Sequence, residues 1–152
     1  MVAVGYLGFL AALGTSAGLI REDLRQHTHE LVIKEKLGQF INLFNDGQTV
    51  GEHLVAERFL ENFPPLNSIG LKKLRDRYLQ SVNPELLKVR LSVEVREILV
   101  DERITFNFNT WTTRVFSLHA CDALVIEEHR TMDVWRNTNG VWTLYRSHLD
   151  EN

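Results

Sequence analysis

The spacing of apolar residues changes once along this chain, at Pro84, and that change limits the elements the chain can form. Between Asp23 and Asp46 apolar residues recur at intervals close to 3.6, the spacing of one face of an amphipathic helix. The pair Asp46-Gly47 is typical of a helix end. Two further stretches, 50–63 and 68–83, show the same spacing. The sequence therefore predicts three helices before Pro84.

Prolines bound two of these predicted helices. Proline lacks an amide donor and restricts the residue before it, so Pro64-Pro65 should stop the second helix. Asn67 or Ser68 should cap the third helix, which Asn83-Pro84 should close. The predicted buried stripe of this third helix consists of Ile69, Leu71, Leu74, Tyr78 and Leu79.

Beyond Pro84 apolar and polar residues alternate, as a half-buried antiparallel strand requires. Asp101-Glu102 indicates a turn. The run Asn137-Thr138-Asn139-Gly140 indicates a hairpin loop, because its residues accept positive φ. The predicted strands are 88–96, one that begins at Ile104, 125–136 and 141–148, with an irregular loop at 117–124.

Helices followed by a meander of strands predict an α+β fold, in which the helices cover one face of an antiparallel sheet of four or more strands. A strongly curved sheet of this kind encloses a cavity. The chain has 152 residues, of which 44% are hydrophobic, enough for one buried core. Its net charge of -3 supplies no basic field for nucleic acid, so none is expected as a partner. Cys121 is the only cysteine, which excludes an intrachain disulfide and a multi-cysteine metal site.

Residues 1–20 carry no charge and form a separate apolar segment before Arg21. As a signal peptide this segment has a small-residue exit that fits cleavage after Ala17. About 20 apolar residues would also just span a bilayer as an uncleaved anchor. Both hypotheses place the protein outside the cytoplasm or on a membrane. A third, a helix buried against the domain or a partner, would leave it cytoplasmic.

The last predicted hairpin carries a resemblance to a known family. The motif Asp133-Val134-Trp135-Arg136, followed by Gly140-Val141-Trp142 and alternating apolar residues, resembles the C-terminal hairpin of the nuclear-transport-factor-2-like superfamily. Within that superfamily, the hairpin is most similar in pattern to SnoaL-like and ketosteroid-isomerase-like proteins. The run Phe40 to Gly47 is similar to the first-helix exit of that family, and 66–78 to its third helix. The resemblance covers residues 27–152 and implies a cone-shaped domain whose helices pack in the concave face of the sheet around an internal pocket.

The resemblance also implies site residues. Asp133 is similar to the protonated carboxylic acid that donates a hydrogen bond to an oxyanion in ketosteroid isomerases. Phe40 stands where those enzymes have a tyrosine, and their general base has no counterpart here. His148 could act as a base with Asp133, and Tyr145 as an alternative partner. Tyr145 and Arg146 should lie on opposite faces of the strand, and the sequence leaves open which one points inward. The residues expected to line a ligand pocket are Phe40, Phe44, Trp135 and Asp133.

Three functions stay open on this sequence. The first is a non-catalytic domain that binds a small apolar ligand in the pocket. The second is a SnoaL-like isomerase, cyclase or dehydratase that uses Asp133 with His148 or Tyr145. The third is an interaction module that forms a homodimer through the outer face of the sheet, where Trp111 or Tyr145 would lie. Neither a cofactor nor a metal is expected, because His27 and His29 diverge on a helix and no phosphate loop or nucleophile motif is present.

Overall fold

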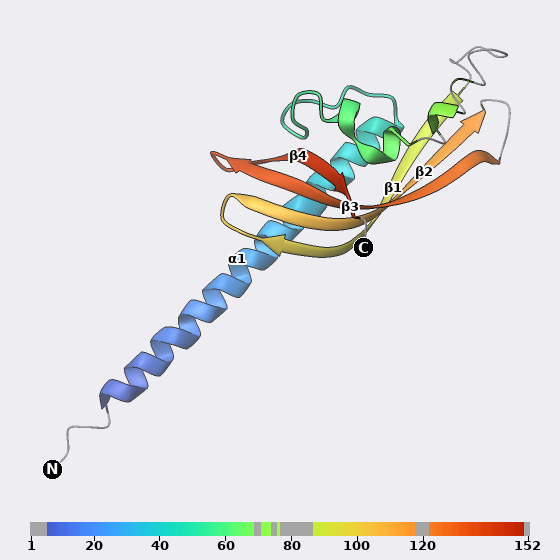
Figure 1. Cartoon of the computed structure of the whole chain (residues 1–152). Helices are drawn as coiled ribbons and strands as arrows, with labels where there is room; N and C mark the ends of the chain where they lie inside the picture. The colour runs from blue at the N-terminus through green and yellow to red at the C-terminus, as the bar shows by residue number, and fades with distance from the viewer. Residues whose placement is uncertain (1–5, 69–70, 74–75, 77–86, 118–121, 151–152) are drawn as a thin grey trace.

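The computed structural model describes residues 6–68, 71–73, 76, 87–117 and 122–150. It consists of one long N-terminal helix, an irregular segment and an antiparallel sheet (Figure 1). The helix is α1 (Tyr6–Asn45), and the irregular segment contains two 3-10 turns, η1 (Leu60–Asn62) and η2 (Pro64–Leu66). The strands are β1 (Leu87–Val100), β2 (Ile104–Ser117), β3 (Ala123–Thr138) and β4 (Val141–Leu149).

The four strands form an open meander in the order β1-β2-β3-β4, with every neighbouring pair antiparallel. The prediction of an α+β fold with four antiparallel strands is therefore confirmed. Both predicted turns are also present. Asn139 and Gly140 have φ of 53° and 85°, which is the left-handed backbone that a tight hairpin between β3 and β4 needs.

The core lies between the inner face of the sheet and the C-terminal half of α1. Ile33, Leu37 and Phe40 on α1 are buried in one cluster with Trp111 and Trp135, and the Phe40 ring contacts the Trp111 indole. The Phe40 ring also meets the rings of the irregular segment, which closes the core. In Figure 1 the N-terminal half of α1 extends past the sheet.

Helix α1 is longer than the predicted helix of 23–46, because Tyr6 to Ile20 continues the same helix. Leu19, Ile20 and Leu24 are exposed on it. Within the described residues no helix is long and apolar enough to cross a membrane. The C-terminal end of α1 is tied to the edge of the sheet, since the Asn45 side chain donates to Leu91 O and accepts from Leu91 N, both at 2.8 Å.

The prediction of a helix from Val50 to Phe63 was wrong. This segment forms turns, and Val55 makes a parallel bridge to Leu144 of β4, with Ala56 N donating to Leu144 O at 2.9 Å. Strand β4 is an edge strand with unpaired backbone groups, and bonding to them replaces the hydrogen bonds of a helix. The helix-like spacing marks which residues are buried and not a helical backbone, because Leu54, Phe59 and Phe63 all lie in the core.

The third predicted helix is described only in part. Leu71 N donates to Ser68 Oγ at 3.1 Å, which confirms Ser68 as its cap, and Leu71 is buried as expected. The other residues of the predicted stripe, Ile69, Leu74, Tyr78 and Leu79, lie outside the described residues, as does Cys121.

Candidate functional site

Asp133 is a fully buried carboxyl group on the inner face of β3. Its Oδ2 accepts from Asn109 Nδ2 at 2.6 Å and from Trp111 Nε1 at 2.9 Å. Its Oδ1 accepts from Thr131 Oγ1 at 2.8 Å and from Ser147 Oγ at 2.5 Å. Strands β2, β3 and β4 thus all contribute donors to one carboxyl group.

A β-bulge in β4 selects Ser147 as the partner of Asp133. Trp135 pairs with Leu144 and Val134 pairs with Arg146, so Tyr145 is the extra residue of the ladder. Without the bulge, Arg146 would lie opposite Asp133. The bulge instead turns Arg146 outward and brings the hydroxyl of Ser147 to the carboxyl group.

Burial raises the pKa of Asp133 above its ordinary value of 3.8. The hydrogen bonds from Ser147, Trp111, Asn109 and Thr131 act in the opposite direction, and desolvation is the larger effect. Two of the partners, Ser147 and Thr131, are hydroxyl groups, which can also accept a hydrogen bond. The site can therefore hold the neutral acid with its proton directed at a hydroxyl oxygen.

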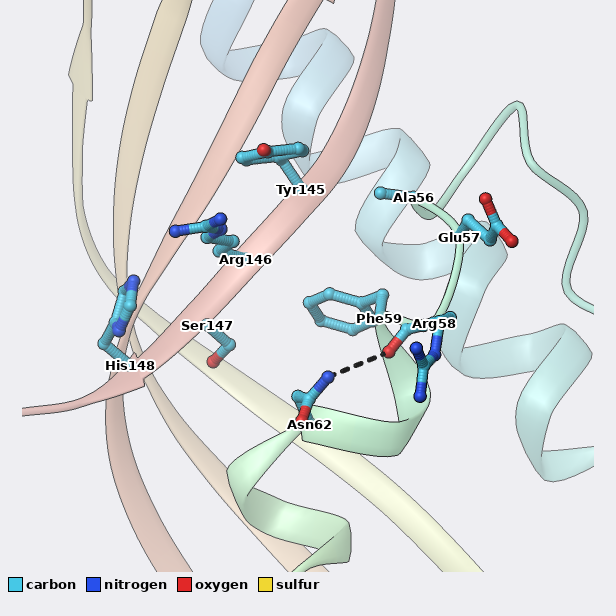
Figure 2. A pocket seen from close by; sticks show the side chains of 9 residues that line it. All are labelled: Ala56, Glu57, Arg58, Phe59, Asn62, Tyr145, Arg146, Ser147 and His148. Carbon is cyan, nitrogen blue, oxygen red and sulfur yellow. Dashed lines mark hydrogen bonds between the residues drawn. The ribbon is translucent and has the colours of Figure 1, made fainter.

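Ser147 also faces an open cleft of about 520 Å³ between β4 and the segment that leaves it after Val55 (Figure 2). Figure 2 shows the lining side chains of β4 on one side of this cleft and those of 56–59 and Asn62 on the other. We call it the β4 cleft; its lining residues are Ala56, Glu57, Arg58, Phe59, Asn62, Tyr145, Arg146, Ser147 and His148. Ser147 is thus the link between the β4 cleft and the buried carboxyl group.

Several inner-face polar atoms near Asp133 have no hydrogen-bond partner among the described residues. They are Thr105 Oγ1, both side-chain polar atoms of Asn107, Asn109 Oδ1 and Trp135 Nε1, all in buried residues. Buried polar atoms are nearly always paired, so such a group calls for an explanation, which a water or a ligand can supply. Asn107 pairs directly with Asp133 across β2 and β3.

The residues predicted for catalysis do not converge on one point. Tyr145 and His148 line the β4 cleft, but neither is among the hydrogen-bond partners of Asp133. The Tyr145 ring lies against the outward-facing guanidinium of Arg136, 3.8 Å from the ring centroid. Strict alternation from Leu144 would turn Arg146 inward, and the bulge at Tyr145 turns Arg146 outward instead.

The residues predicted to line a ligand pocket lie in the core instead of the β4 cleft. Phe40 and Trp135 are fully buried, and Phe44 is partly buried against them. Trp111 or Tyr145 was expected on the outer face of the sheet, and for Trp111 that expectation was wrong. Trp111 is buried, because its position in the register puts it on the inner face, where its indole N–H reaches Asp133.

Sequence reasoning missed Ser147, Asn109 and Asn62. Ser147 follows a bulge, and nothing in the local sequence marks where a ladder will gain a residue. Asn107 and Asn109 alternate with Phe106 and Phe108, so the apolar pattern alone would place them on the outer face, and the structure buries them instead. Among the described residues no three His, Cys, Asp or Glu side chains come together to hold a metal ion.

Comparison with known proteins assigns no family and no function to this site. No protein-family model matches the chain, and no curated protein is significantly similar to it.

Proposed function

We propose that this protein binds a small molecule in the β4 cleft without chemically altering it. One observation carries the proposal: the Ser147 hydroxyl lines the β4 cleft and donates to a fully buried carboxyl group. A buried carboxyl group costs stability unless it is paired, and perturbed acids gather at functional sites. Ser147 can exchange hydrogen bonds with a ligand while Asp133 holds it in place.

Binding is favoured over catalysis by the arrangement of the acid. Asp133 has four side-chain partners, and none of them is a basic group. Acid–base catalysis needs a base within hydrogen-bond reach of the reacting proton, and His148 is not bonded to Asp133. The apolar body of a ligand would meet Phe59 and Tyr145 at the walls of the β4 cleft.

The cone with an internal pocket, which the family resemblance implies, is part of this proposal. In that arrangement the ligand site continues from the β4 cleft toward the inner face of the sheet. The unpartnered polar atoms of Thr105, Asn107 and Trp135 support such an extension, since a ligand that reached them would supply the missing hydrogen bonds.

A cleft-filling substitution tests the proposal. Ala56→Phe should lower the affinity for the neutral fluorescent probe phenylnaphthylamine by at least about tenfold, because the larger side chain occupies the β4 cleft. Ala56→Ser is the matched control and should bind like the wild type. Fluorescence titration gives the affinities, and circular dichroism checks the fold. Absence of saturable binding in the wild type, or binding that survives Ala56→Phe, would contradict the proposal.

A further inference from the structure

Two arginines share one aromatic ring at the rim of the β4 cleft. The guanidinium carbon of Arg136 lies 3.8 Å from the centroid of the Tyr145 ring, and that of Arg146 lies 5.1 Å from it. Both distances fall within the range of cation–π attraction. The contacts orient two positive groups toward the same ring from neighbouring strands.

Neither guanidinium has a carboxylate partner among the residues that the structure describes. By contrast, Arg58 on the opposite wall is paired with Glu61 at 2.7 Å. A contact with a ring face leaves the N–H groups at the rim of a guanidinium free to donate. The two guanidinium groups therefore present positive charge beside the β4 cleft that no described carboxylate neutralises.

We propose that the ligand of the β4 cleft carries an anionic group, a carboxylate or a group of similar charge, which Arg146 binds and Arg136 reinforces. The inference rests on the proposed binding function and names its ligand class. Arg146 is the one of the two that lines the β4 cleft. Its planar N–H pairs fit a carboxylate through two parallel hydrogen bonds, and Arg136 adds positive charge behind Tyr145. Glu57 lies on the other wall, and Figure 2 shows its carboxylate directed away from β4.

A matched pair of probes separates this inference from the binding function itself. Anilinonaphthalene sulfonate and phenylnaphthylamine share an aromatic body, and only the first carries a sulfonate. The full chain should bind the sulfonate at least about tenfold more tightly, the size expected for one charge-assisted hydrogen-bonding contact. Arg146→Gln should remove that preference, so that the affinity for the sulfonate falls at least about tenfold more than the affinity for phenylnaphthylamine. Arg90→Gln is the matched control, because Arg90 also lies over a ring, that of Phe116, but outside the β4 cleft.

Each outcome has a defined meaning. Equal affinities for the two probes would overturn the anionic ligand class and leave the binding function standing. A preference that persists in Arg146→Gln would overturn the role of Arg146. If neither probe binds the wild type, the proposed function fails and the ligand class fails with it. Rising salt should weaken sulfonate binding and leave phenylnaphthylamine binding unchanged.

Discussion

The hydrogen bonds around Asp133 can be satisfied by a neutral group. Trp111 Nε1 is an obligate donor and bonds to Oδ2, whereas the hydroxyls of Thr131 and Ser147 bond to Oδ1 and can reverse their direction. An asparagine at this position could accept from Trp111 and donate to the two hydroxyls. The raised pKa means that the folded state holds the proton more tightly than the unfolded chain.

Asp133→Asn should therefore become more stable relative to the wild type as pH rises. For an acid whose folded pKa is raised, the stabilisation is complete below the unfolded pKa, near 3.8, and is lost as pH climbs through the folded pKa. Each unit of the shift corresponds to about 1.4 kcal/mol. Urea unfolding at pH 4 and pH 7 measures the difference, with exposed Asp23→Asn as control. If Asp133→Asn instead loses stability relative to the wild type from pH 4 to pH 7, the folded state favours the ionised form of Asp133.

At the scale of elements, glycine has opposite effects on stability in two places. It is favourable in the hairpin between β3 and β4 and unfavourable in the interior of α1. Gly140 has φ of 85°, which residues with a side chain rarely adopt. Gly38 lies inside α1, where an added methyl group would meet nothing within 4 Å. Glycine in a helix interior costs about 0.5–1 kcal/mol relative to alanine. The same substitution should thus have opposite signs at the two sites.

Gly140→Ala should destabilise the protein by about 1 kcal/mol, and Gly38→Ala should stabilise it by about 0.5–1 kcal/mol. Denaturant unfolding of both variants beside the wild type measures the two changes, and each variant serves as the control for the other. Equal signs would mean that Gly140 does not have a positive φ or that Gly38 does not lie in a helix interior.

At the scale of the whole molecule, the outer face of the sheet carries exposed apolar side chains. Leu99, Phe106 and Val134 form one row across β1, β2 and β3, and Leu99 and Phe106 remain 47% and 36% exposed. Phe108 and Met132 form the next row. A contiguous apolar face of this kind is typical of a surface that binds another protein, and a second copy of the chain is the partner that the sequence predicts.

Phe106→Asp should shift the protein from dimer to monomer, because it would bury a charge at the centre of this face. Sedimentation equilibrium at tens of micromolar measures the mass. Leu31→Asp, at an exposed position on α1, is the control and should leave the mass unchanged. A wild type that sediments as a monomer at this concentration would remove the prediction.

Local sequence patterns determined most of the elements, because burial and backbone preference leave their mark on residues close together in the chain. The alternation beyond Pro84 specified the four strands, Asn139-Gly140 specified the hairpin turn, and Asp46-Gly47 specified the end of α1. Asp133 was also singled out from sequence, because the hairpin that carries it resembles the last hairpin of a known superfamily.

Tertiary structure alone decided where the site lies. The segment 50–63 has the spacing of a helix, but its backbone bonds to the open edge of β4, a partner almost 90 residues further along the chain. The bulge at Tyr145 reverses which residues of β4 face inward, so that Ser147 and not Arg146 meets Asp133. Both outcomes depend on which backbone groups of β4 bond to β3 and which remain available to the segment 50–63. Such pairing is a property of the assembled sheet, and no stretch of sequence contains it.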